Sequence, residues 1–156
     1  MTRITLVIAL TLLVAFSSTR PALAQSSCKP VVGHFEASVV PPPECTAPFC
    51  TAGRVWGGVQ GHYSFAMTSL QPSVAVPTIF FFTGQSDITV KNDDHVFGTD
   101  TGSLDVGPEG GFASLITFTG GTGAMAGATG QIRLRGQLDQ AEGTTSGDYF
   151  GTLCTP

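Results

Sequence analysis

Residues 112–138 read FASLITFTGGTGAMAGATGQIRLRGQL, and this stretch decides the fold class. Before its glycines, Phe112 and Phe118 share a parity with other apolar residues and alternate with small or polar ones. After the glycines, Ile132 and Leu134 alternate with glutamines and arginines in the same way. A period of two residues is typical of a β-strand that buries one face. The stretch therefore predicts two strands joined by a compact loop.

The loop between these strands, residues 120–130, is the most distinctive segment of the chain. It holds five glycines, which adopt positive φ angles and close backbone approach at little cost. A strand, a GGTG turn, small residues around Met125, a glycine and a second strand together resemble the signature of the allene oxide cyclase and dirigent group of β-barrels. The resemblance covers about the last third of the chain, residues 114–153. It implies an eight-stranded antiparallel barrel, a small apolar or phenolic ligand and, as in many such proteins, a homotrimer.

A nucleotide site is the rival interpretation of the same glycines. Gly121, Gly123 and Gly127 give a G-x-G-x-x-x-G pattern after a strand, and Asp139 follows it. A dinucleotide fingerprint requires a helix directly after the turn, with its N-terminus facing the pyrophosphate. Here a strand pattern begins at once, and the loop contains no lysine of the kind a P-loop needs. The glycines are therefore interpreted as a structural turn, and no cofactor is expected.

The start of the chain has the pattern of a secretory signal peptide. Arg3 precedes an apolar run over residues 4–16, and Ala22 and Ala24 form an A-x-A cleavage site. The run is shorter than the roughly 20 residues that a membrane-spanning helix needs, so no transmembrane span is expected. The sequence predicts a signal peptide at 1–24, removed on export, and a single domain at 25–156. The expected location is secreted, either periplasmic or extracellular.

The charge balance excludes one class of partner. The chain has 7 basic and 11 acidic residues, and removal of the signal peptide would take away Arg3 and Arg20. The exported domain would then be more acidic than the full chain, whose net charge is −4. An acidic surface without a basic patch repels phosphate backbones, so nucleic acid is not an expected partner.

The cysteines predict two disulfides. Cys28, Cys45, Cys50 and Cys154 are even in number, and an exported protein folds in an oxidising compartment. Three connectivities exist, of which we favour Cys28 with Cys154, joining the two ends of the domain, and Cys45 with Cys50, closing a small loop. A four-cysteine zinc site is the alternative, but the chain has no C-x-x-C pair. No metal site is expected.

A proline-rich segment separates the first two predicted strands. Residues 39–53 read VVPPPECTAPFCTAG, and proline cannot donate to a central sheet ladder. The segment therefore predicts a stiff loop at one end of the barrel. The family pattern has no equivalent. If this loop covers the barrel end, it restricts entry to any cavity inside.

The other strands are expected at residues 31–40, 54–70 (one bent strand or a hairpin), 77–83, 85–91, 95–99, 104–106 and 145–153. Asp100 and Gly102 interrupt the run between 95 and 106, which predicts a short hairpin there. Asp93, Asp94, Asp100 and Asp105 lack the ligand spacing of a calcium loop and are expected in turns and at strand edges. With no convincing amphipathic helix, the chain predicts an all-β fold, a closed eight-stranded antiparallel β-barrel.

A barrel of this size is either filled by its own side chains or holds one small ligand. Nearby glycines favour a cavity by leaving room beside the aromatic residues, although those residues could also fill the interior. The residues expected to line a ligand pocket are Tyr63, Phe65, Phe80, Phe82, Phe118 and Tyr149. The ligand expected from the resemblance is a small apolar or phenolic molecule.

Two functions remain open. The first is a cyclase-like or dirigent-like protein, in which the pocket folds a flexible substrate into one conformer and so directs its cyclisation or coupling. A carboxylate buried among apolar walls, with a raised pKa, would serve as proton donor or acceptor there. The candidates are Glu36, Asp87 and Asp148, none of which matches a catalytic position of the family by motif. The second function is a non-catalytic secreted binding or structural protein, for example of a cell envelope.

Overall fold

The computed structural model describes residues 26–108 and 110–156, so the predicted signal peptide lies outside the described residues. Within them the chain forms eight β-strands and two 3-10 turns. In chain order these are β1 (Ser27–Val39), β2 (Cys50–Gly57), β3 (Gly61–Pro72), β4 (Ile79–Thr89), η1 (Lys91–Asp93), β5 (His95–Asp105), β6 (Gly111–Gly121), η2 (Gly123–Met125), β7 (Thr129–Asp139) and β8 (Thr144–Thr155). None of the described helical turns has the length and apolar character needed to cross a bilayer.

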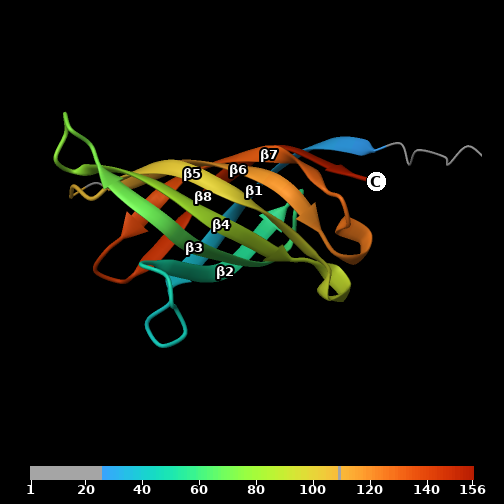
Figure 1. Ribbon diagram of the computed structural model, residues 1–156, viewed down its shortest axis with the longest axis horizontal. Helices are drawn as coiled ribbons and strands as arrows, with labels where there is room; N and C mark the ends of the chain where they lie inside the picture. Colours follow the sequence, from blue (N-terminus) through green and yellow to red (C-terminus); the bar gives the residue numbers. More distant parts are fainter. Residues whose placement is uncertain (1–25, 109) are drawn as a thin grey trace, which may run out of the picture.

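The strands form one closed antiparallel barrel, in which each strand pairs with its neighbours in the sequence (Figure 1). Closure comes from β1 and β8, which pair from Ser27 with Thr155 to Ser38 with Thr144. Every strand thus has a partner on both sides, and closure removes the two edge strands that an open sheet would have. The predicted fold class is confirmed.

The glycine-rich stretch that predicted the fold forms β6, the turn η2 and β7. Gly123 and Gly127 have φ angles of 52° and 76°, which the other residue types adopt only at a cost in energy. Ala128 is fully buried where the loop turns back into the sheet. The loop forms the three-residue turn η2 and leads into β7, so these glycines lie in a turn between two strands, as predicted, and the α-helix of a dinucleotide fingerprint does not follow them.

Three strand predictions need correction or refinement. Residues 54–70 form the hairpin of β2 and β3, and the two runs predicted at 77–83 and 85–91 are one strand, β4. The short hairpin predicted at 95–106 is wrong, since β5 runs unbroken through Asp100 and Gly102. Both residues are paired on each side: Asp100 lies opposite Gly84 of β4 and Ile116 of β6. The ladders with β4 and β6 hold β5 in place despite the weak strand propensity of Asp100 and Gly102.

Both favoured disulfides are present. Cys28–Cys154 joins β1 to β8, where the two cysteines are register partners. Cys45–Cys50 closes the proline-rich loop between β1 and β2. One bridge therefore lies where the ends of the barrel chain meet, and the other lies at the opposite end of the barrel.

Half of the barrel interior is closely packed. This half, called the packed half below, lies toward Ser27 and Thr155 and is filled by Val31, Val59, Ile88, Val96, Phe118, Ala128, Ile132, Tyr149 and Leu153. The Tyr149 hydroxyl accepts a hydrogen bond from the backbone N–H of Val59 at 2.8 Å and lies within donating distance of the carbonyls of Val59 (2.9 Å) and Trp56 (3.1 Å). Tyr149 thus fixes the turn between β2 and β3 over this end of the barrel.

Candidate functional site

The other half of the interior contains a small cavity. It has a volume of about 50 Å³ and is lined by Phe35, Phe49, Thr51, Tyr63, Phe65, Met67, Phe82, Asp100, Leu104, Phe112, Ser114, Leu138 and Thr145. We call this half the cavity half. Most of its wall is apolar, and all of the lining residues except Phe49 belong to strands. The cavity is therefore a hollow left inside the barrel, with walls fixed by the sheet.

Asp100 is the charged residue of this wall, and it is only 2% exposed. It lies on β5 at the same parity as Val96 and Leu104, so the pleat of the strand turns its side chain inward. A buried carboxylate is costly unless hydrogen bonds or charges compensate for the lost water. Its surroundings therefore decide what it can do.

Hydrogen bonds satisfy one oxygen of this carboxylate and leave the other unpaired. The Ser86 hydroxyl donates to Asp100 Oδ2 at 3.0 Å, and Tyr63 Oη lies 3.4 Å from Ser86 Oγ. Because Ser86 uses its single proton on the carboxylate, the Tyr63 hydroxyl is the donor of the second bond. Asp100 Oδ1 is buried without a hydrogen-bond partner. The site thus offers an unsatisfied acceptor on the wall of an apolar cavity.

Burial raises the pKa of Asp100 to about 6. The Ser114 hydroxyl, which lies near the carboxyl without forming a hydrogen bond of regular geometry to Oδ1, and the Ser86 hydroxyl act in the opposite direction. Desolvation, together with the negative charge of Asp100, raises the pKa of the Tyr63 hydroxyl above its usual range. Tyr63 therefore stays protonated at all ordinary pH values. Asp100 changes its charge near neutral pH, where a group serves best as a general acid or base.

Aromatic rings form the apolar part of the wall and explain why the cavity is small. Phe65 meets Phe82 edge to face at 5.7 Å between centroids, and Phe35 lies 5.8 Å from Phe112. A Cβ atom at Gly84 would collide with the ring of Phe65. The expectation that glycines leave free room is thus wrong at this point, because a neighbouring ring occupies the space.

The predicted pocket residues divide between the two halves. Tyr63, Phe65 and Phe82 line the cavity. Phe118 and Tyr149 are buried in the packed half, and Phe80 is half-buried near the start of β4. The structure therefore brings three of the six to the cavity, and a role in ligand binding stays a prediction for the whole set.

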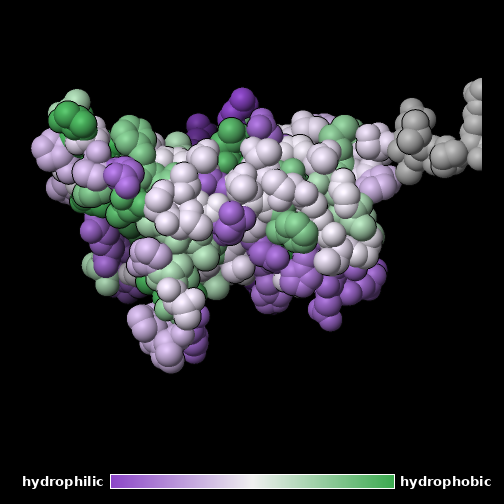
Figure 2. Space-filling model, viewed as in Figure 1, coloured by the Kyte–Doolittle hydropathy of each residue, from purple (hydrophilic) through white to green (hydrophobic). Residues whose placement is uncertain are grey.

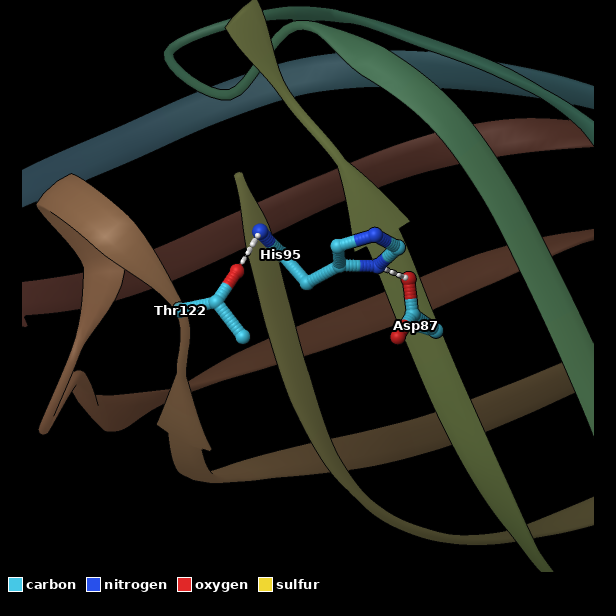
Figure 3. Close-up of polar contacts among 3 residues, drawn as sticks. All are labelled: Asp87, His95 and Thr122. Atoms are coloured by element: carbon cyan, nitrogen blue, oxygen red, sulfur yellow. Dashed lines mark hydrogen bonds and ion pairs between the residues drawn. The ribbon is translucent and has the colours of Figure 1, made fainter. Parts of the chain in front are cut away.

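The predicted catalytic carboxylates lie on the outer face of the barrel. Glu36 and Asp148 are exposed, and Asp148 Oδ2 is 4.0 Å from Arg135 on the same face. Asp87 Oδ1 contacts His95 Nδ1 at 2.8 Å, and both side chains are half-exposed (Figure 3). None of the three carboxylates lines the cavity.

The carboxylate inside the barrel, Asp100, was expected in a turn or at a strand edge, and that expectation is wrong. An unbroken alternation through Val96, Gly98, Asp100, Gly102 and Leu104 was the signal that could have placed it inside. The turn roles hold for two of the other aspartates. Asp94 accepts a hydrogen bond from Ala124 N at 2.9 Å, and Asp105 accepts one from Gly107 N at 2.8 Å.

The proline-rich loop reaches the cavity through its last residue, Phe49. The loop projects from the wall of the barrel between β1 and β2 (Figure 1). The carbonyl of Phe49 accepts a hydrogen bond from Met67 N at 2.9 Å, which fixes its backbone against β3. The ring packs against the core and supplies one wall of the cavity. This loop thus contributes a wall, while its tip stands away from the barrel.

Comparisons with known proteins give one kind of likeness. No protein-family model matches the chain, and no curated protein matches it. Among solved structures, the chain is similar to the pterocarpan synthase dirigent protein GePTS1, with 11% sequence identity and a TM-score of 0.39, over 90% of this chain and 98% of that one. No residue role is transferred from it.

Proposed function

We propose that the barrel binds a small, largely apolar molecule that carries a hydroxyl group, such as a phenol, and directs its cyclisation or coupling. The observation that carries this proposal is Asp100 Oδ1, an unpaired acceptor on the wall of an apolar cavity. A bound hydroxyl would donate to this oxygen and remove the cost of its desolvation. Apolar parts of the ligand would contact the surrounding phenylalanines.

The chemistry follows from the protonation behaviour of Asp100. With a pKa of about 6, the carboxylate can take the proton of a reacting hydroxyl at neutral pH and return it to the product of a cyclisation. In a coupling, a separate one-electron oxidant would form the phenoxyl radicals, and the barrel would only orient them. The Ser86 hydroxyl and, behind it, Tyr63 stabilise the ionised form through hydrogen bonds. The rigid walls hold the ligand in one conformer, so selection of the product rests on positioning.

Entry of a ligand requires the cavity to widen. A volume of about 50 Å³ is small beside the roughly 300 Å³ or more of typical ligand pockets. The strand residues of the cavity wall are held by pairing with a neighbouring strand on each side, whereas Phe49 belongs to a loop. Outward movement of the Phe49 ring is therefore the least costly way to admit a ligand.

The proposed function includes export of a single domain, residues 25–156. Two disulfides in a small domain are typical of an oxidising, extracytoplasmic compartment. The signal-peptide pattern at residues 1–24 supports the same location.

A matched pair of ligands tests the proposal. Para-cresol and para-xylene have the same shape, and only the cresol donates a hydrogen bond. Titration calorimetry at pH 7 should show that the protein prefers para-cresol by about tenfold, since a hydrogen bond to a charged group contributes about 1.5 kcal/mol or more. Asp100→Leu should abolish the preference, and the matched outer-face variant Asp87→Asn should retain it.

Failure of both ligands to bind would contradict the binding function, and equal affinity of the native protein for the two would contradict the role of Asp100. Product analysis with a substrate that can cyclise would then separate a catalyst from a carrier. A carrier binds para-cresol through Asp100 and leaves the product distribution of such a substrate unchanged.

The second candidate function, a structural or assembly protein, has one observation in its favour. Phe81 and Phe150 are 53% and 45% exposed on the outer face, and the Arg133 guanidinium lies 5.8 Å from the centre of the Phe150 ring. Apolar side chains of this size on a barrel wall are typical of interfaces between subunits. Light scattering that gives a trimer mass for the native protein and a monomer mass for Phe150→Ser would support assembly.

A further inference from the structure

The connection between β3 and β4 has an unusual surface. It projects beyond the end of the barrel (Figure 1), and Figure 2 shows apolar surface at its tip. Val74 is fully exposed there, and Leu70 and Val76 are 42% and 46% exposed. These three residues are called the apolar tip below. Loops of this length usually carry polar residues, so an apolar loop needs an explanation.

The sequence around the apolar tip is free of charge. Residues 63–86, YSFAMTSLQPSVAVPTIFFFTGQS, contain no aspartate, glutamate, lysine, arginine or histidine. They cover most of both strands that carry the tip, β3 and β4, while His62 and Asp87 lie at the strand ends remote from it. A charged side chain on such a projection would resist transfer from water into an apolar medium by several kcal/mol. The tip and the adjoining parts of both strands lack this obstacle.

The backbone of the tip satisfies most of its own hydrogen bonds. Ser73 N donates to Ile79 O at 2.8 Å, and Ile79 N donates to Val76 O at 3.1 Å. The Ser73 hydroxyl accepts from the N–H groups of Ala75 and Val76, both at 3.2 Å. Pro72 and Pro77 have no N–H to satisfy. A protein partner supplies hydrogen bonds to a loop, whereas lipid acyl chains supply none, so this self-sufficiency favours a lipid environment.

We propose that the apolar tip inserts into the surface of a lipid bilayer of zwitterionic composition. The tip contributes no positive charge, and the chain as a whole has a net charge of −4. Anionic lipids would therefore repel the protein, and burial of apolar surface has to provide the affinity. The interaction is reversible, since three aliphatic side chains offer only a few kcal/mol.

The inserted tip would lie beside the cavity half of the barrel. Phe82, which lines the cavity, lies on β4 three residues after Ile79, where the tip returns to the sheet. An apolar ligand dissolved in the bilayer would thus have a short route to the cavity. This consequence rests on the proposed function, whereas insertion of the tip does not.

Vesicle flotation tests the insertion. With the native domain and vesicles of phosphatidylcholine, we expect a fraction of the protein to float with the lipid, and Val74→Asp together with Val76→Asp to lower the bound fraction at least tenfold. Val32 is 66% exposed on the outer face of β1, so Val32→Asp is the matched control and should float like the native protein. Replacement of about a third of the lipid by phosphatidylserine should weaken binding.

A fluorescent reporter provides a second test, which reports directly on insertion of the tip. Trp56 is the single tryptophan, and it lies in β2, away from the apolar tip. Val74→Trp in a Trp56→Phe background should show a blue shift of emission on addition of phosphatidylcholine vesicles. An unshifted spectrum, or equal flotation of the native protein and the Val74/Val76 double variant, would overturn the proposal. Loss of oligomer mass in that double variant without lipid binding would instead identify the tip as a contact between copies.

The two proposals can fail separately. The double variant at Val74 and Val76 should bind para-cresol as the native protein does, because neither residue lines the cavity. Asp100→Leu should float with vesicles unchanged. Lipid binding without para-cresol binding would thus overturn the proposed function alone.

Discussion

The two halves of the barrel interior are built on the same eight strands but differ in how completely side chains fill them. In the packed half, Ile88 and Val96 are 1% and 0% exposed, and the space is filled. In the cavity half, aromatic rings contact one another and leave a cavity of about 50 Å³ beside the carboxylate of Asp100. The two halves differ in side-chain shape: aliphatic residues make up most of the packed half, whereas rings of phenylalanine make up much of the cavity wall.

The same division separates the two disulfides. Cys28–Cys154 lies at the packed end and spans 126 residues of sequence, whereas Cys45–Cys50 lies at the cavity end and spans 5. We therefore expect the packed half to contribute more to stability, while the cavity half is the part that the proposed function assigns to a ligand. Three predictions follow from this division of roles, in order of decreasing effect.

The largest effect is expected from the long disulfide. A bridge that closes a loop of this length restricts the unfolded chain far more than the short one, by about 5 kcal/mol against about 2 kcal/mol on the loop-entropy model. Replacement of Cys28 and Cys154 by serine should therefore lower the free energy of unfolding much more than replacement of Cys45 and Cys50. Urea unfolding of the two double variants measures the difference, and equal losses would contradict the assignment of stability to the packed end.

A smaller effect is expected from truncation of single side chains. Ile88→Ala and Leu104→Ala remove the same number of carbon atoms, one from the packed half and one from the cavity wall. Ile88→Ala should cost about 4 kcal/mol of unfolding free energy, and Leu104→Ala about 2 kcal/mol, because Leu104 is only half-buried beside an existing hollow. Thermal or urea denaturation provides both values. A larger loss for Leu104→Ala would show that the cavity half carries the core.

The smallest effect is a pH dependence that only the cavity half should show. Burial raises the pKa of Asp100 from 3.8 to about 6, so the folded protein retains this proton over a range in which the unfolded chain has lost it. The favourable contribution is complete below pH 3.8 and is lost as the pH rises through about 6. At neutral pH the loss amounts to at most about 3 kcal/mol.

The pH dependence is measured by comparison with a variant that cannot ionise. Unfolding of the native protein and of Asp100→Asn at pH 4 and pH 7.5 should show the variant gaining stability relative to the native protein as the pH rises. Other titrating groups cancel in this difference, because both proteins contain them. A difference that does not change with pH would mean that Asp100 ionises inside the barrel without cost.

The sequence predicted the fold well because β-barrels depend on alternation and glycine turns, and both are visible in residues 112–138. The disulfides followed from the even number of cysteines and their positions in the chain. The site was harder to predict, because Asp100 and Gly102 are weak strand formers and local propensity favoured a turn. Pairing with β4 and β6 overrides that propensity, and such long-range ladders are invisible in one short window of sequence.

The alternation of a strand shows that a side chain points into the barrel, but it does not show whether that side chain lines the cavity or belongs to the packed half. Phe82 and Phe118 have the same residue type and both point inward, yet only Phe82 reaches the cavity. Whether each ring reaches the cavity depends on its position along the barrel axis, called its depth, and on the rings of neighbouring strands. Depth is set by the register of all eight ladders, so it could be known only from the closed structure.

Pairing of the first strand with the last makes the connectivity of the barrel a ring. Ser27, where β1 begins, lies directly opposite Thr155, where β8 ends, so the two ends of the barrel domain are neighbours. A short peptide linker could join them, and the chain could be opened instead at one of the exposed turns without breaking a strand pair. Circular permutants of this domain should therefore fold, because the barrel depends on which strands pair and not on which strand comes first in the sequence.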